Sequence, residues 1–177
     1  YFRGRVEAVI NVFINSALAF PPLILLLAIT AVLQPRLSTL IIALTLLTIP
    51  SFARLGRANT LSFAGREFVL AARASGAGHI RTIFRELLPN VVLPVGSYAF
   101  IIIASVMIAE GSLSFLGLGI PPPAVSWGGM IAEGQPYLST NPYLVFIPAL
   151  PFLFTVLSFN VLGNRARRRF DVRQSAL

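Results

Sequence analysis

The stretch REFVLAARASGAGHIRTIFRELLPN, residues 66–90, is a charged insert between two long apolar segments of the chain. Its first half is rich in residues that favour helices, and its second half carries apolar residues at helical spacing, namely Ile80, Ile83, Phe84, Leu87 and Leu88. Gly76 and Gly78 separate the halves, and glycine readily ends a helix because it tolerates positive φ. Pro89 suits the first turn of a new helix. The stretch therefore predicts a helix, a sharp turn, a second helix with one apolar stripe, and a boundary at Leu88–Pro89.

The composition around this insert is that of a membrane protein. Of 177 residues, 56% are hydrophobic and 11% are charged, whereas soluble domains carry about 25% charged residues. The net charge is +8, but the arginines lie at the ends of apolar runs and not along one polar face, so we expect no nucleic-acid partner. Without cysteine, and with a single histidine, the chain offers neither thiolate nor multi-histidine metal ligands, and we expect no metal and no cofactor.

Four apolar segments are long enough to cross a membrane as helices. A hydrocarbon core of about 30 Å needs about 20 helical residues, and lipid excludes open strands because their edges would stay unpaired. The predicted spans are residues 8–35, 37–55, 90–113 and 142–164. Residues 61–89 form one connecting loop. Residues 114–141 form another, with a short helix around Met130, because their glycines and the prolines at 121–123 argue against a span.

The arginines orient these spans. Thirteen of the fourteen lie before the first span, between the second and third, or after the fourth, and only Arg36 lies on the other side. Loops rich in arginine remain in the cytoplasm. We therefore expect residues 61–89 to be cytoplasmic and residues 114–141 to be external.

Two interpretations of the cytoplasmic insert remain open from its periodicity. It is either an amphipathic hairpin lying in the lipid headgroups or a short helix that docks into a groove of a cytoplasmic protein.

The motifs of the insert resemble those of a known family. Ala71-Ala72, Gly76 four residues after Ala72, and Leu88-Pro89 resemble the EAA loop of permeases of ABC importers. The stretches AEGSLSFLGLGIPPP, SWGGMIAEG and SFNVLGNRARRRFD are similar to the dipeptide/oligopeptide/nickel branch of that family. The resemblance runs the full length of the chain and covers about the last two-thirds of a typical member. It implies an all-α, polytopic transmembrane bundle with four of the six helices of a type I (MetI-like) permease, truncated at the N-terminus.

The resemblance also implies a function. Such a permease moves a solute across the bacterial or archaeal cytoplasmic membrane, here a di- or oligopeptide, or nickel or a similar small solute. Its implied partners are two cytoplasmic ABC ATPases, a sister permease in a heterodimer, an extracytoplasmic substrate-binding protein and membrane lipid. The implied ATPase-coupling residues are Ala71, Ala72, Gly76, Ala77, His79, Ile80, Arg81, Ile83, Leu88 and Pro89. Two residues differ from the family pattern: Leu70 replaces its glutamate, and Glu86 precedes Leu-Leu-Pro.

Outside the insert, Glu110 is the principal candidate residue. It lies near the outer end of the third span, where a carboxylate either gates or lines a substrate path or pairs locally at the water boundary. Trp127 and Glu133 lie in the external loop, as contacts for a binding protein or, for Trp127, as an interfacial anchor.

Two other kinds of membrane protein are alternatives to an importer subunit. An ion-gradient-driven transporter or channel is the main one, but such proteins carry ionisable residues within their spans, and every predicted span centre here is uncharged. A membrane scaffold that transports nothing is the other. No lysine is available for a phosphate-binding loop, and no nucleophile lies beside a base, so we expect no enzymatic activity and expect ATP hydrolysis to belong to separate subunits.

Overall fold

The computed structural model describes residues 1–33 and 36–175, and every regular element in these ranges is helical. The α-helices are α1 (Arg5–Ala19), α2 (Pro22–Val32), α3 (Leu37–Ala64), α4 (Glu67–Ala74), α5 (His79–Arg81), α6 (Leu88–Phe115), α7 (Trp127–Gly134) and α8 (Tyr143–Ser175). A π-helix, η1 (Thr82–Leu87), joins α5 to α6, and a 3-10 turn, η2 (Gln135–Tyr137), follows α7. The predicted all-α class is confirmed.

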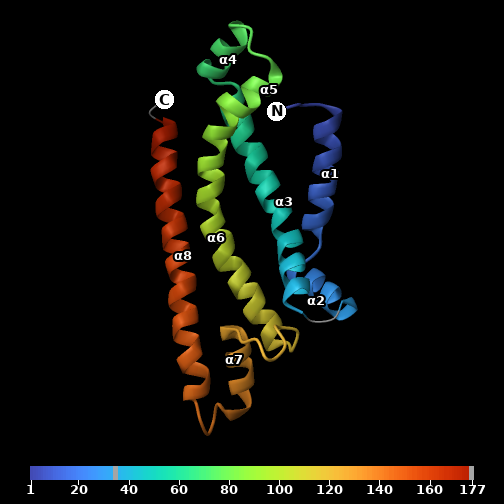
Figure 1. The fold of residues 1–177 in the computed structure, drawn as a ribbon, viewed down its shortest axis with the longest axis vertical. Coiled ribbons are helices and arrows are strands. Elements are labelled where there is room, and N and C mark those ends of the chain that lie inside the picture. The colour runs from blue at the N-terminus through green and yellow to red at the C-terminus, as the bar shows by residue number, and fades with distance from the viewer. Residues whose placement is uncertain (34–35, 176–177) are drawn as a thin grey trace.

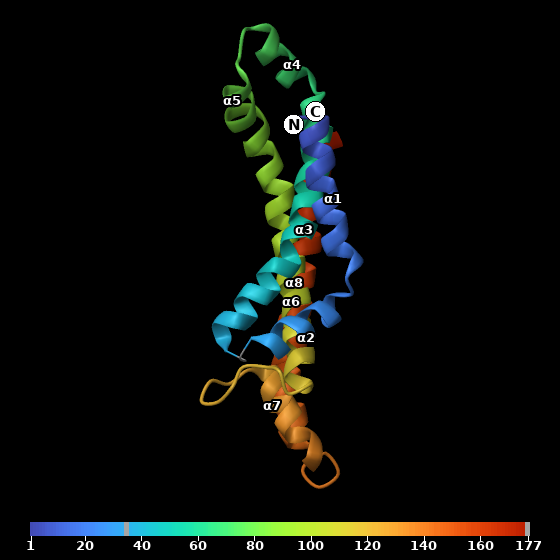
Figure 2. The ribbon, with the colours of Figure 1, turned by 90° about the vertical axis from the view of Figure 1, so that its right-hand side faces the viewer.

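The long helices stand side by side in a single layer, in the order α8, α6, α3, α1 (Figure 1). Figure 2 shows this layer edge-on, where it is much narrower. Both termini and the α4–α5 hairpin lie at one end, and α2 and α7 lie at the other. The arginine-rich segments therefore share one end of the molecule, which is the arrangement that the predicted orientation requires.

Among the described residues, three helical stretches are long and apolar enough to cross a membrane: Leu37–Ala64, His79–Phe115 and Tyr143–Arg169. The predicted first span, 8–35, differs from the structure because it is not one helix. Helices α1 and α2 meet at an angle of 84°, with Phe20 and Pro21 extended between them. Proline disfavours helical geometry in the residue before it, so Pro21 and Pro22 end α1 and allow α2 to start afresh. Residues 34–35 of that predicted span lie outside the described residues.

Two other helices extend beyond the ends predicted for their spans. Helix α3 continues to Ala64 and α8 to Ser175, beyond the predicted ends at residues 55 and 164. The predicted boundary at Leu88–Pro89 coincides with the start of α6 at Leu88, although the helical run His79–Phe115 continues through it and changes there from π- to α-geometry. Pro89 lies in the first turn of α6. In the first turn a backbone nitrogen has no hydrogen-bond partner within its helix, so proline is tolerated there.

Little of the molecule is buried. One cluster joins α2, α3 and α6 through Leu26, Leu40, Ala43 and Leu113, and another joins the hairpin to the inner ends of α3 and α6. Elsewhere large apolar side chains face outward, such as Phe13 at 72% and Ile147 at 63% exposure. A layer one helix thick cannot cover its own faces, so lipid or neighbouring helices must cover them.

Candidate functional site

A tight turn at Gly76 joins the two halves of the hairpin. Its φ is +84°, a conformation that residues with a Cβ atom adopt at a cost. The Gly76 amide donates to the carbonyl of Arg73 at 3.0 Å, and the Ala77 amide donates to the carbonyl of Ala72 at 3.0 Å. This pair of bonds is the Schellman motif, in which a left-handed glycine satisfies the last carbonyls of a helix. Gly76 thus ends α4 and reverses the chain toward α5.

A small buried cluster packs the hairpin against the spans. Val69 of α4 and Leu87 of η1 are buried at 0% and 2% exposure, and they pack with Phe63 of α3 and Val91 of α6. Thr82, also fully buried, donates its hydroxyl proton to the carbonyl of Gly78 at 3.0 Å. The hairpin is therefore packed against the inner ends of α3 and α6.

The apolar residues of the predicted stripe in the second half differ in burial. Leu87 is buried at 2% exposure, whereas Ile80, Phe84 and Leu88 are exposed at 76%, 65% and 42%. The π-helical geometry of residues 82–87 adds a residue to each turn, so side chains that an α-helix would align are divided between two faces. One face contacts the spans, and the other leaves the apolar side chains of Ile80 and Phe84 exposed.

The residues that the family resemblance assigned to ATPase coupling gather on this hairpin, at one end of the molecule (Figure 1). Most of them are exposed, and the remainder are half-buried, namely Ala72, Ala77 and Ile83. Leu70, which stands where the family has glutamate, is exposed at 53%. The half-buried Glu86 accepts a bond from the Asn90 amide group at its backbone carbonyl, at 2.7 Å.

The hairpin also touches the start of the chain, a contact that no sequence pattern indicates. The Tyr1 hydroxyl and His79 Nδ1 share a hydrogen bond of 2.8 Å, and the guanidinium of Arg73 lies 5.9 Å from the centre of the Tyr1 ring. Helix α1 is in turn tied to α3, because Arg57 pairs with Glu7 at 2.6 Å. The hairpin therefore contacts the segment that leads into α1 as well as α3 and α6.

At the opposite end, Glu110 joins three segments. Its Oε1 atom accepts hydrogen bonds from the hydroxyls of Ser114 and Ser126, both at 2.7 Å. Ser126 is the N-cap of α7, and its hydroxyl oxygen also accepts a bond from the Gly129 amide at 3.0 Å. The carboxylate of α6 thus holds the N-terminus of α7 in place. The expected short helix around Met130 is α7 itself.

Glu110 lines a pocket of about 460 Å³ between α3, α6, α7 and α8. Its other lining residues are apolar except Ser126, and they include Trp127, Met130 and Phe152. The rings of Trp127 and Phe152 meet edge to face, with centroids 6.4 Å apart. Glu133, by contrast, is exposed on α7.

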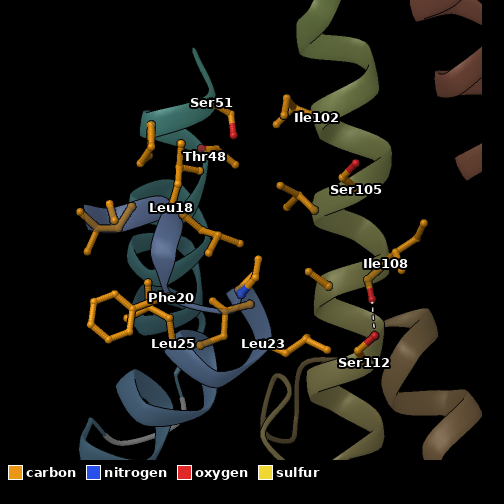
Figure 3. Close-up of a pocket in the computed structure, with 18 of the residues that line it drawn as sticks. Leu18, Phe20, Leu23, Leu25, Thr48, Ser51, Ile102, Ser105, Ile108 and Ser112 are labelled. Carbon is orange, nitrogen blue, oxygen red and sulfur yellow. Dashed lines mark hydrogen bonds between the residues drawn. The ribbon is translucent and has the colours of Figure 1, made fainter. Parts of the chain in front are cut away.

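A second pocket, of about 450 Å³, lies between α2, α3 and α6. Figure 3 shows Thr48 and Ser51 on one of its walls and Ser105 and Ser112 on the other. Ser105 and Ser112 donate their protons to carbonyls of α6, at 3.1 and 2.8 Å. Their hydroxyl oxygens can still accept hydrogen bonds, so the wall of α6 offers acceptors and no charge.

Within the described residues, no group of three histidine, cysteine, aspartate or glutamate side chains lies close enough to hold a metal ion.

Comparison with known proteins gives a family match and named relatives. Residues 1–175 match the family described as binding-protein-dependent transport system inner membrane component. The chain is 36% identical over 169 residues to a protein named as a putative peptide transport system permease of Brucella suis, covering 96% of this chain and 57% of that protein. It is 36% identical over 171 residues to the glutathione transport system permease protein GsiD of Escherichia coli, covering 97% of this chain and 56% of that protein.

The chain thus spans a little over half the length of these curated relatives. The family match nevertheless covers nearly the whole chain, including the hairpin, Glu110 and α7. Together with the helical architecture, it shows that the chain belongs to the family of binding-protein-dependent transport system inner membrane components.

Proposed function

We propose that this chain forms part of a permease subunit that imports its solute with energy from ATP, and that the hairpin of residues 64–90 is its contact with a cytoplasmic ATPase. The observation that carries the proposal is the exposure of Ile80 and Phe84, at 76% and 65%, on a hairpin fixed by a buried core. Exposed apolar side chains on a rigid element are typical of a surface that fits into a groove of another protein.

The position of the hairpin supports the same proposal. It lies at the arginine-rich end of the molecule, which we assign to the cytoplasm (Figure 1). Its second half continues without a break into α6, which runs to the outer end beside α7. A push on the hairpin would therefore act directly on a helix that crosses the membrane, as rigid-body transitions require.

The proposed cargo is a di- or oligopeptide, since the relatives are named for peptide and glutathione transport. Nickel or another small solute is the alternative. The acceptor hydroxyls of the pocket in Figure 3 suit the N–H groups of a peptide backbone. The proposed partners are two ABC ATPases, a sister permease and an external substrate-binding protein, in a bacterial or archaeal cytoplasmic membrane.

The test uses the full-length permease assembled with its partners in proteoliposomes. Ile80→Asp places a charge in the proposed groove, and Gly76→Pro breaks the turn that aims the hairpin. We expect both variants to insert into the membrane and assemble with the other subunits while ATP-driven uptake is lost. Ser62→Asp is the control, because Ser62 is exposed on α3 beside the hairpin and not on it. Normal uptake in both hairpin variants would overturn the docking proposal.

A further inference from the structure

The carboxylate of Glu110 is placed in a pocket whose walls are almost entirely apolar. Among the residues that line this 460 Å³ pocket, the polar ones are Glu110 and Ser126. A solute that enters it therefore meets one charged group, and that group is an anion. Charged groups near a membrane span are costly unless they are paired or serve a purpose.

The hydrogen bonds to the carboxylate of Glu110 come from neutral groups. Both are donated to Oε1, by the neutral hydroxyls of Ser114 and Ser126. Neutral donors orient a carboxylate without contributing a positive charge, as an arginine would. The positive end of α7, which begins beside Ser126, adds only a partial charge. The two serines thus hold Glu110 in one orientation without adding a positive charge beside it.

Aromatic side chains complete the site. Trp127 and Phe152 line the same pocket as Glu110, and their rings meet edge to face. The faces of aromatic rings attract ammonium groups, most strongly when water is excluded. A carboxylate beside aromatic and aliphatic walls is suited to a protonated amine that carries an apolar side chain.

We propose that Glu110, with Trp127 and Phe152, binds the protonated amino group of the transported solute at the outer end of the membrane. This site rests on the proposed import function and adds a residue that selects for a positive charge. Its ligand is an ammonium group next to an apolar side chain, supplied either by the free amino terminus of a peptide or by a lysine side chain.

The experiment measures ATP-driven uptake by the complete transporter in proteoliposomes, with one binding protein throughout. Three probes are compared: an apolar tripeptide with a free amino terminus, its N-acetylated form, and an N-acetylated tripeptide containing lysine. Each variant's uptake is divided by wild-type uptake of the same probe, so any preference of the binding protein cancels.

Glu110→Gln removes the charge and keeps an oxygen that can accept both serine bonds. We expect it to lower uptake of the free-amino tripeptide by about tenfold, as for the loss of one hydrogen bond to a charged group, with little change for the acetylated form. Loss of lysine-peptide uptake as well would extend the site to side-chain amines. Unchanged lysine-peptide uptake would restrict it to the peptide terminus.

Two further variants separate charge from structure. Glu133→Gln is the matched control, because it makes the same substitution at an exposed position of α7, and any effect that it has through the external loop should be equal for all three probes. Ser126→Ala removes one bond to Glu110 and the cap of α7 but keeps the charge, so its effect should be the same for the free and acetylated tripeptides.

The proposal fails if Glu110→Gln lowers uptake of both apolar tripeptides equally, because Glu110 would then serve only to hold α7. It also fails if uptake of neither changes. Absence of ATP-driven uptake in the wild-type transporter is a different result, which would overturn the proposed import function itself.

Discussion

Gly128 of α7 lies against Gly111 of α6, so closely that a Cβ atom on Gly128 would be 2.6 Å from the Gly111 Cα. The same Cβ would be 3.2 Å from Glu110 Oε2 and from Ser114 Cβ. The contact of α7 with the outer end of α6 thus depends on the missing side chain at Gly128. It brings Ser126 within hydrogen-bonding distance of Glu110.

Gly128→Ala should therefore push α7 away from α6. We expect a loss of stability of about 1–3 kcal/mol, the usual range for overpacking, measured as a lower Tm of the purified full-length permease. Gly129→Ala is the control on the same helix, because its Cβ would meet only the Ser126 Oγ at 3.4 Å. An equal fall in Tm for both variants would contradict the close contact.

Gly76→Ala tests the turn of the hairpin. An alanine at φ +84° costs about 1–2 kcal/mol, so the hairpin should open more often and its amides should exchange hydrogen faster. Gly78→Ala provides the comparison, since Gly78 has φ −67° and open space around it. Hydrogen exchange followed by mass spectrometry should show faster exchange over residues 72–82 in the first variant alone.

Leu87→Ala and Leu88→Ala compare two neighbours that differ in burial at the junction of η1 and α6. Leu87 is buried and Leu88 is 42% exposed, so Leu87→Ala should destabilise the inner end of the molecule by about 2–5 kcal/mol and Leu88→Ala by much less. Thermal unfolding of the full-length permease distinguishes them. Equal destabilisation by the two variants would contradict this difference in burial.

Arg57 and Glu7 test the attachment of α1 to α3. Their contact of 2.6 Å is partly exposed, with the side chains at 46% and 25% exposure. We expect a coupling energy of about 0.2–1 kcal/mol, as for other solvent-exposed ion pairs. A double-mutant cycle with Arg57→Ala and Glu7→Ala, using Tm as the measure and run at low and high salt, should show coupling that weakens as salt screens the charges. Additive single effects would show that the pair does not hold the helices together.

The features that depend on neighbouring residues were predictable from the sequence. The length of each apolar run indicated the spans, the arginines indicated which ends lie together, and Gly76 indicated the turn after α4. These signals are local, because hydrocarbon thickness, loop charge and backbone freedom each act on a short stretch of chain.

Features that depend on distant residues were not predictable in this way. The bond between Ser126 and Glu110 joins residues 16 positions apart, and the bond between Tyr1 and His79 joins residues 78 apart. The π-helix at residues 82–87 escapes periodicity analysis, which assumes one residue spacing throughout a helix. The two prolines after Phe20 can kink a span, but they do not by themselves specify the angle of 84° or the packing of α2 on α3 and α6.

The helical run from His79 to Phe115 is long enough for a small rotation at one end to move the other end by several ångströms. Its 37 residues correspond to about 55 Å of helix, nearly twice the thickness of the hydrocarbon core. If such a rod pivots about its cytoplasmic end by about 5°, its far end sweeps about 5 Å, roughly the rise of one helical turn. A displacement of that size would move Glu110 and α7 by about the diameter of an amino group. A small rotation at the proposed ATPase contact would then suffice to make or break the proposed contact of Glu110 with a solute.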